Sequence, residues 1–138
     1  GEFSFLLFNM NCHGEIPISG TVSMTAEKGE AVKVLEEDFR VIDNCLCIRM
    51  PEEVDHHHAE ELCRIADHHI LEEQVENVLF DFSDTRFMDS SGIGILIGRY
   101  RLISCFGGKV YAAHPDKQIR RMLEMSGMKK IVEIVGEK

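Results

Sequence analysis

The residues of this sequence that could carry chemistry are concentrated in residues 87–100, Phe-Met-Asp-Ser-Ser-Gly-Ile-Gly-Ile-Leu-Ile-Gly-Arg-Tyr. Asp89 stands where a helix N-cap belongs, because an aspartate carboxylate accepts hydrogen bonds from the unpaired backbone N–H groups of a first helical turn. Ser90 is then the first helical residue, and its hydroxyl should face solvent. The segment therefore predicts an exposed hydroxyl group at the start of a helix.

Three glycines follow Ser90 within the same expected helix, and two of them lie on its face. Gly94 and Gly98 share a helical face with Ser90 and Ile97, and each glycine costs about 1 kcal/mol relative to alanine in a helix interior. They could flatten the surface below Ser90, so that another protein approaches the hydroxyl, Ile95 and Ile97 closely. They could equally let the helix press against a neighbouring element. The spacing alone does not decide between these two interpretations.

Enzymatic chemistry at this segment fits the sequence less well. The glycines at 92, 94 and 98 lack the G-x-G-x-x-G spacing of dinucleotide-binding turns, and no Walker lysine accompanies them. Ser90 and Ser91 lack the G-x-S-x-G elbow of serine hydrolases. We therefore expect no cofactor, no catalytic residue and no enzymatic activity.

The histidine-rich stretches suggest a metal site at first sight. They comprise His56, His57, His58, His68 and His69. Successive helical residues point about 100° apart, and neither an H-x-x-x-H pair nor H-E-x-x-H occurs. We expect an exposed helix start here, with no metal bound.

Length and charge restrict the class of protein. A chain of 138 residues with 44% hydrophobic residues is long enough for one core and too short for two comfortable domains. The formal net charge of −9 argues against a nucleic-acid partner, because phosphate backbones are bound by clustered Lys and Arg. A protein partner is the better expectation.

Cysteine usage and apolar run lengths favour a cytoplasmic protein. The five cysteines, at positions 12, 45, 47, 63 and 105, form no C-x-x-C pair or regular framework and read as buried, reduced thiols. No apolar run approaches the roughly 18 to 20 residues that span a bilayer. Residues 3–8 are apolar, but no basic region precedes them as in a signal peptide.

Residues 1–35 differ from the rest of the chain and are expected to form an N-terminal extension, followed by one domain over residues 36–138. The opening Gly1-Glu2-Phe3 could derive from an expression vector, and Met24 could be the natural start. The apolar residues 3–8 should pack on something, for example an open sheet edge.

The remaining pattern predicts the order β-β-α-β-α-β-α-β. Strands at 39–42 and 45–50 are joined by Asp43-Asn44, which tolerate the positive φ of a tight hairpin. Helical spacing of apolar residues begins after Asp55, a plausible N-cap. Helices are expected over 55–70, 90–105 and 114–125, and strands over 78–82, 109–113 and 131–135.

Strands connected through helices must run parallel, with right-handed crossovers. The fold class is therefore α/β: a mostly parallel sheet with an N-terminal hairpin and helices packed on it, with residues 78–82 in the middle. The helix that starts at Ser90 should dock on the sheet through one apolar stripe, formed by Ile93, Leu96, Tyr100 and Ile103.

A set of short segments also matches a known family. They are Asp55-His56-His57, residues 78–82, residues 87–94, Gly98-Arg99-Tyr100, Gly107-Gly108 and Met125-Ser126-Gly127. Together they resemble the sporulation-type anti-sigma factor antagonists (anti-anti-sigma factors) of the bacterial STAS domain family. The likeness covers about residues 36–136, and the Met-Asp-Ser-Ser-Gly stretch followed by Gly-Arg-Tyr is specific.

The resemblance implies a switch protein that binds an anti-sigma factor, itself a serine kinase, and so releases a sigma factor for transcription. The kinase would inactivate the protein by phosphorylating Ser90, and a serine phosphatase would restore it. The implied partner surface consists of Asp55, His56, His57, Asp89, Ser90, Ser91, Gly92, Gly94, Ile95 and Gly98.

The sequence departs from the family pattern in three places. Pro51-Glu52-Glu53-Val54 precedes Asp55 where relatives usually have Gly-Glu-Leu, and His58 replaces a common Thr. Relatives also carry a final helix, whereas the given sequence stops after its last expected strand. We therefore expect the N-terminal extension or a homodimer to cover the face that this helix would cover. A STAS switch or scaffold module of another signalling system is the alternative reading.

Overall fold

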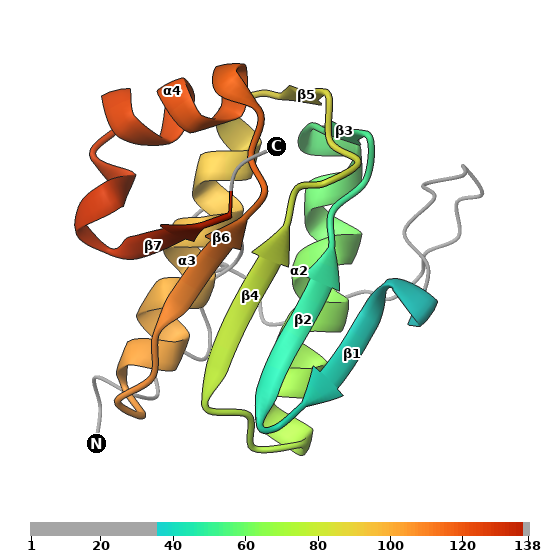
Figure 1. The fold of residues 1–138 in the computed structure, drawn as a ribbon. Coiled ribbons are helices and arrows are strands. Elements are labelled where there is room, and N and C mark those ends of the chain that lie inside the picture. The colour runs from blue at the N-terminus through green and yellow to red at the C-terminus, as the bar shows by residue number, and fades with distance from the viewer. Residues whose placement is uncertain (1–35, 137–138) are drawn as a thin grey trace, which may run out of the picture.

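The sheet has five strands in the spatial order β1-β2-β4-β6-β7. The computed structural model describes residues 36–136, and the strands are β1 (Phe39–Ile42), β2 (Cys45–Arg49), β4 (Asn77–Asp81), β6 (Val110–Ala113) and β7 (Val132–Val135) (Figure 1). Only the β1–β2 pair is antiparallel; the other neighbouring pairs are parallel. The predicted mostly parallel α/β sheet with an N-terminal hairpin is confirmed.

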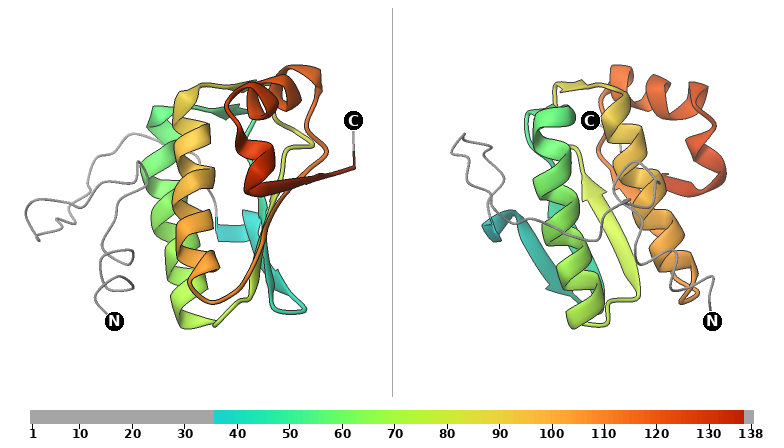
Figure 2. Two further views of the ribbon diagram at one scale, coloured as in Figure 1. Left: turned by 90° about the vertical axis from the view of Figure 1, so that its left-hand side faces the viewer. Right: turned by 180° about the vertical axis from the view of Figure 1, so that it is seen from behind.

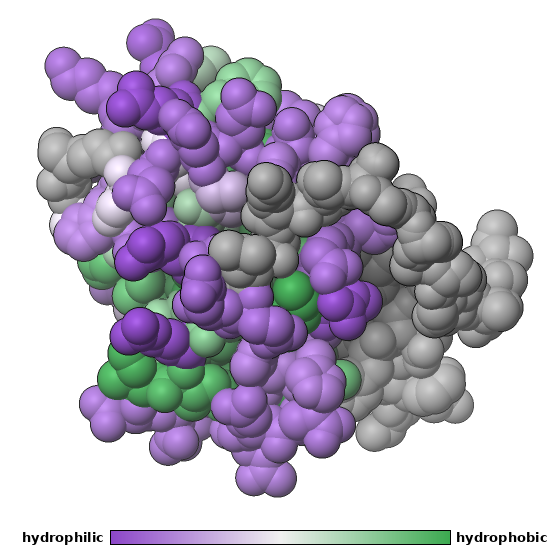
Figure 3. Space-filling model, turned by 90° about the vertical axis from the view of Figure 1, so that its right-hand side faces the viewer, coloured by the Kyte–Doolittle hydropathy of each residue, from purple (hydrophilic) through white to green (hydrophobic). Residues whose placement is uncertain are grey.

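The turn between β1 and β2 is the one that the sequence predicted. Asp43 and Asn44 have φ values of 53° and 65°, and Ile42 pairs with Cys45 across the turn. Two consecutive residues with positive φ give the turn a twist that matches the flanking strands. β1 forms one edge of the sheet, and hydrophilic residues cover most of the coloured surface on that side of the molecule (Figure 3).

Three helices accompany the sheet: α2 (His56–Glu72), α3 (Ser90–Ser104) and α4 (Lys117–Met125). α2 and α3 lie side by side on one face of the sheet, whereas α4 lies beyond the ends toward which the parallel strands point (Figures 1 and 2). The described residues also form two short 3-10 helices, η1 (Glu36–Asp38) and η2 (Met128–Lys130).

The start of α4 corrects one prediction. The helix was expected over residues 114–125, but Asp116 is the N-cap, and its carboxylate accepts a hydrogen bond from the Ile119 N–H at 2.8 Å. Pro115 therefore precedes the cap. The side chain of Asp116 satisfies an orphan N–H group of the helix, which is why the helix begins at Lys117 and not at residue 114.

β4 lies in the middle of the sheet, as predicted. Val78, Phe80 and Phe82 have no exposed surface and form the core together with the buried faces of α2 and α3. Leu79 and Asp81 alternate with them, are half-buried, and lie on the opposite face of the sheet.

The apolar stripe predicted for α3 is only partly correct. Leu96 and Ile103 are fully buried, but Ile93 and Tyr100 are only partly buried. Ile95 and Arg99 take their places in the interior, with 0% and 2% of their surface exposed. The buried face of α3 is therefore rotated from the predicted one.

Arg99 lies between α3 and α2. Its Nε is 2.9 Å from Oδ1 of Asp67 on α2, and its Nη1 donates to the Sγ of Cys63, also on α2. Burial raises the pKa of Asp67, and the positive charge of Arg99 opposes that rise. An ion pair thus joins the two helices on the sheet.

The cysteines among residues 36–136 are all free thiols. Cys63 is buried, Cys45 and Cys47 are half-buried, and Cys105 is exposed, so the expectation of buried thiols fails at Cys105. Cys12 and the predicted N-terminal extension lie outside the described residues. Among the helices of the described part, none is long and apolar enough to cross a membrane.

We expect Arg99→Met to lower the free energy of unfolding by about 2 kcal/mol, because it leaves the half-buried Asp67 carboxylate without its cation. Urea denaturation at neutral pH measures the change. Arg101→Met, at an exposed position of the same helix, is the matched control and should change stability by less than about 0.5 kcal/mol. Equal stability of Arg99→Met and wild type would contradict a structural role for the ion pair.

Candidate functional site at two helix N-termini

A second, two-stranded sheet places the starts of α2 and α3 next to each other. β3 (Glu53–Val54) runs parallel to β5 (Phe87–Met88), with Val54 opposite Met88. The Asp89 N–H donates to the Val54 carbonyl at 3.0 Å. This β3–β5 ladder brings the two predicted surface segments together at one end of the main sheet.

A buried threonine ties the loop before Ser90 to the segment before Asp55. Thr85 has no exposed surface, and its Oγ1 donates to the Pro51 carbonyl at 2.8 Å. Sequence reasoning missed Thr85 and the β3–β5 ladder, because two-residue strands show no periodicity and a lone threonine in a loop carries no pattern.

Asp55 is the N-cap of α2, as predicted. Its Oδ1 accepts hydrogen bonds from the backbone N–H groups of His57 and His58, at 3.0 and 3.2 Å, and lies 2.8 Å from His58 Nδ1. Burial raises the pKa of Asp55, but hydrogen bonds to His58 and His57 and the charge of His58 outweigh this effect and lower it. Only 19% of the Asp55 side chain is exposed, so the carboxylate is largely engaged by its own helix.

Asp89 is the N-cap of α3, also as predicted. Its Oδ1 accepts from the Ser91 N–H at 2.8 Å, and its carbonyl accepts from the Gly92 N–H at 2.9 Å. Ser90 is the first helical residue and is exposed, whereas Ser91 is half-buried. The two adjacent serines therefore differ in accessibility.

Gly92 allows the first turn of α3 to sit directly on the β3–β5 ladder. A Cβ atom at this position would lie 2.3 Å from Met88 Cγ and 3.2 Å from Val54 Cγ1. Since Gly92 is buried, close packing inside the protein accounts for the absence of a side chain. The sequence had left the role of Gly94 and Gly98 open, and this close contact concerns Gly92 alone.

The other residues of the predicted α3 surface are not equally available. Ile95 has no exposed surface, so its predicted contact with a partner is wrong: the side chain points into the core. Gly98 is buried as well. Gly94 and Ile97 are half-buried. Ser90 is therefore the most accessible residue of this face, and Gly94 and Ile97 are accessible in part.

The histidines at the start of α2 do not form a metal cluster. His56 and His57 are exposed, with ring centroids 4.0 Å apart, and His58 contacts Asp55. At the other end of α2, the Nδ1 of His69 lies 2.7 Å from an oxygen of Glu73. Across residues 36–136, no group of three or more His, Cys, Asp or Glu side chains could hold a metal ion.

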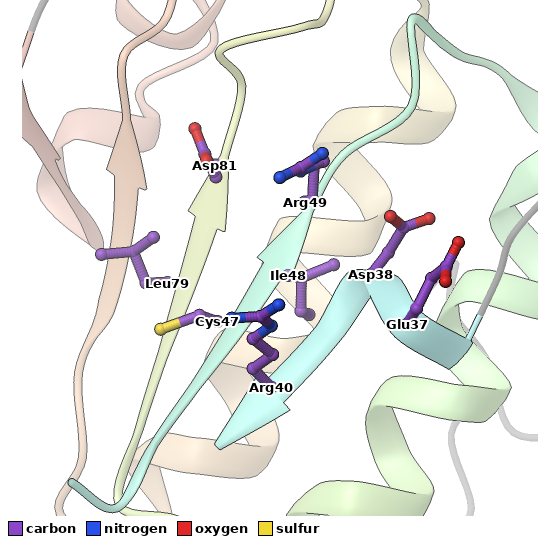
Figure 4. Close-up of a pocket in the computed structure, with 8 residues that line it drawn as sticks. All are labelled: Glu37, Asp38, Arg40, Cys47, Ile48, Arg49, Leu79 and Asp81. Atoms are coloured by element: carbon purple, nitrogen blue, oxygen red, sulfur yellow. The ribbon is translucent and has the colours of Figure 1, made fainter. Parts of the chain in front are cut away.

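A separate hollow of about 440 Å³ opens on the sheet face that α2 and α3 leave uncovered. Figure 4 shows its lining, which includes Arg40 and Cys47 above the strands and Asp81 near the end of β4. Cys45 lies two residues before Cys47 on β2. Burial, together with the charge and hydrogen bond of Cys47, raises the pKa of Cys45 to about 11. Cys45 is therefore protonated at neutral pH and is a poor nucleophile.

Comparisons with known proteins agree with this arrangement. A family model described as "STAS domain" matches residues 37–137. An anti-sigma F factor antagonist from Paenibacillus polymyxa is 36% identical over 89 residues, which are 64% of this chain and 76% of that protein. Another from Lysinibacillus sphaericus is 30% identical over 81 residues, or 59% of this chain and 69% of that protein.

Solved structures show the same similarity. The anti-sigma factor antagonist SpoIIAA in its unphosphorylated form is similar with a TM-score of 0.63 and 27% identity, over 70% of this chain and 86% of that one. The phosphorylated form of SpoIIAA, described as a Bacillus cell fate determinant, is similar with a TM-score of 0.58 and 27% identity, over 70% and 89% of the two chains.

The Asp55 cap generates a prediction for pH dependence. Because the pKa of Asp55 is lowered in the folded state, from an unfolded value of about 3.9, its ionised form stabilises the fold above about pH 4. This contribution is lost as the pH falls through the lower, folded pKa. Asp55→Asn keeps a capping side chain but lacks the charge. The stability difference from wild type should therefore be largest near neutral pH and shrink below about pH 4.

Urea denaturation over a pH series measures this difference. Glu60→Gln removes one charge from an exposed position of the same helix and serves as the control. A difference between wild type and Asp55→Asn that stays constant down to about pH 3 would show that the charge of Asp55 contributes nothing.

Proposed function

Because this chain belongs to the STAS domain family, we propose that it is an anti-sigma factor antagonist that phosphorylation of Ser90 inactivates. In the unmodified state it binds an anti-sigma factor that is also a serine kinase, and a sigma factor is released. A serine phosphatase reverses the modification. The chain acts by binding its partner and not by catalysing a reaction. It does so in the cytoplasm, where the sigma factor works. Residues 36–138 form its STAS domain and residues 1–35 an N-terminal extension.

The exposed position of Ser90 is the observation that carries the proposal. Ser90 follows the Asp89 cap and is exposed, whereas Ser91 is half-buried and its backbone N–H is held by Asp89. A kinase must take the serine hydroxyl into its own active site. Among these two serines, Ser90 meets that requirement without any unfolding of the helix.

The partner surface includes the residues that the β3–β5 ladder brings together. Asp55, His56 and His57 start α2 on one side of the ladder, and Asp89 and Ser90 start α3 on the other. His56 and His57 are exposed and can donate hydrogen bonds to a partner. A partner that covers Ser90 would therefore meet both helix starts in one contact.

Phosphorylation would change the surface without dismantling the fold. A phosphate carries about −1.5 to −2 charges, and the N-terminus of a helix favours an anion by its dipole and its free N–H groups. At a packed interface the same phosphate must lose its hydration next to the Asp89 carboxylate, which opposes association. The interface therefore weakens while the fold remains.

Phosphorylation should depend on Ser90 and not on Ser91. Incubation with the kinase-type anti-sigma factor of the same genome and ATP, followed by mass spectrometry, should show one phosphate on wild type and on Ser91→Ala. Ser90→Ala should show none, since it lacks the acceptor hydroxyl. A label that persists in Ser90→Ala and disappears in Ser91→Ala would reverse the assignment.

Ser90→Asp should fold normally and bind the anti-sigma factor poorly. The added carboxylate lies at a helix N-terminus, where it is tolerated, so the melting temperature should stay close to that of wild type. Affinity should fall by at least about tenfold, or about 1.4 kcal/mol. Titration calorimetry and a circular dichroism melt of wild type, Ser90→Ala and Ser90→Asp separate the two effects.

The phosphorylated protein itself completes this comparison. If both Ser90→Asp and the phosphorylated protein bind as tightly as wild type, Ser90 is an ordinary first-turn serine and the switch is rejected. A large drop in melting temperature instead would mean that the modification acts by destabilising α3.

A further inference from the structure

A groove of about 260 Å³ lies between β5 and α4, on the chain segment that leads into Ser90. Its lining is mainly apolar with a basic rim, and consists of Arg86, Phe87, Met88, Gln118, Ile119, Arg121, Met122 and Met125. We call it the β5–α4 groove. Its α4 residues lie outside the partner surface predicted from the sequence.

The α4 side of the groove is a second apolar stripe on a short helix. Ile119 and Leu123 are the buried residues by which α4 packs on the protein. Arg121, Met122 and Met125 lie on another side and line the groove, and Met125 is 78% exposed. Met122 also packs against the edge of the core, whereas Met125 leaves most of its apolar surface to solvent.

The opposite wall contributes an exposed aromatic ring. In β5, Met88 is buried and Phe87 is 52% exposed, because successive strand residues point to opposite sides. Exposed aromatic and methionine side chains around one groove are typical of protein-binding surfaces, since they offer large and adaptable apolar contacts.

We propose that the β5–α4 groove binds an apolar segment of the anti-sigma partner that also carries carboxylates. This inference rests on the proposed function and identifies a second contact next to Ser90. Two observations select this occupant: the charge at the rim, and the continuity of the groove with the phosphorylation site.

The rim of the groove is positively charged, although the protein as a whole carries a negative net charge. Arg86 and Arg121 line the groove in a chain with a formal net charge of −9. The Arg86 Nε lies 3.3 Å from an oxygen of Glu52, but both side chains are more than two-thirds exposed, so the arginine can exchange this contact for one with a partner. Guanidinium groups bind carboxylates in two-pronged geometry.

The groove is continuous with the proposed phosphorylation site through β5. Phe87 stands three residues before Ser90, and Met88 occupies the space next to Gly92 in the first turn of α3. An acidic segment in the groove would therefore lie near a phosphate on Ser90. Repulsion between the two negative charges would then add to the desolvation of the phosphate.

The experiment measures binding of the kinase-type anti-sigma factor of the same genome to the full-length chain and its variants. Phe87→Ser removes the aromatic wall of the groove and should weaken binding by about tenfold or more. Phe106→Ser is the matched control, because Phe106 is 56% exposed and follows the opposite end of α3. The affinity of Phe106→Ser for the anti-sigma factor should stay within about twofold of the wild-type affinity.

Two more variants guard against trivial loss of folding. Met125→Ser alters the most exposed hydrophobic residue of the groove. It should also weaken binding, while its melting temperature stays close to that of wild type. Arg121→Glu should weaken binding and reduce its salt dependence, compared with Arg101→Glu on exposed α3 surface.

The outcomes separate the groove from the switch. If wild type binds the anti-sigma factor and Phe87→Ser, Met125→Ser and Arg121→Glu bind it equally tightly, the groove is not a contact. The proposed function then remains intact. Failure of wild type to bind overturns the proposed function. Sedimentation tests whether the groove instead joins two copies of this chain. If Phe87→Ser binds the anti-sigma factor as tightly as wild type but changes from a dimer to a monomer, the proposal is wrong.

Discussion

The contact between Arg99 and Asp67 fixes α3 against α2, and the position of Ser90 depends on it. Both helices start at the same end of the sheet, so any sliding between them would move Ser90 relative to Asp55. A buried ion pair contributes little net stability, because the loss of hydration offsets most of the attraction. It does penalise arrangements in which the charges separate, since the buried Arg99 would then lack its counter-charge. The pair therefore serves alignment of the helices more than total stability.

At the helix starts, two effects of different size act on a negative charge. The helix dipole stabilises an exposed anion at its N-terminus by about 0.3 to 1 kcal/mol. Removing the hydration of a charged group without a compensating partner costs several times more. The first effect concerns the free protein and the second concerns the complex. A phosphate on Ser90 is therefore compatible with the fold and unfavourable in an interface, provided that the interface buries it.

The sequence predicted those features that depend on local pattern. Asp43 and Asn44 marked the hairpin because they tolerate positive φ, and the caps at Asp55 and Asp89 follow from their carboxylates. The rotated face of α3 was missed because this helix has isoleucines on several sides, so that periodicity does not select one face. Arg99 was missed because a charged residue is expected outside unless its partner is known, and Asp67 lies 32 positions away. The β3–β5 ladder is a tertiary feature without a local signal.

A switch that acts by charge requires that the modified atom cannot move away from the interface. A phosphoserine in a mobile loop could turn toward water, and the partner would lose little affinity. Here the Asp89 carboxylate holds the first turn of α3 through Ser91, and Gly92 seats that turn against Met88 and Val54. The Asp89 N–H is bound to Val54 at the end of the ladder. Because these contacts hold the backbone on both sides of Ser90, a phosphate there would stay at the proposed partner surface.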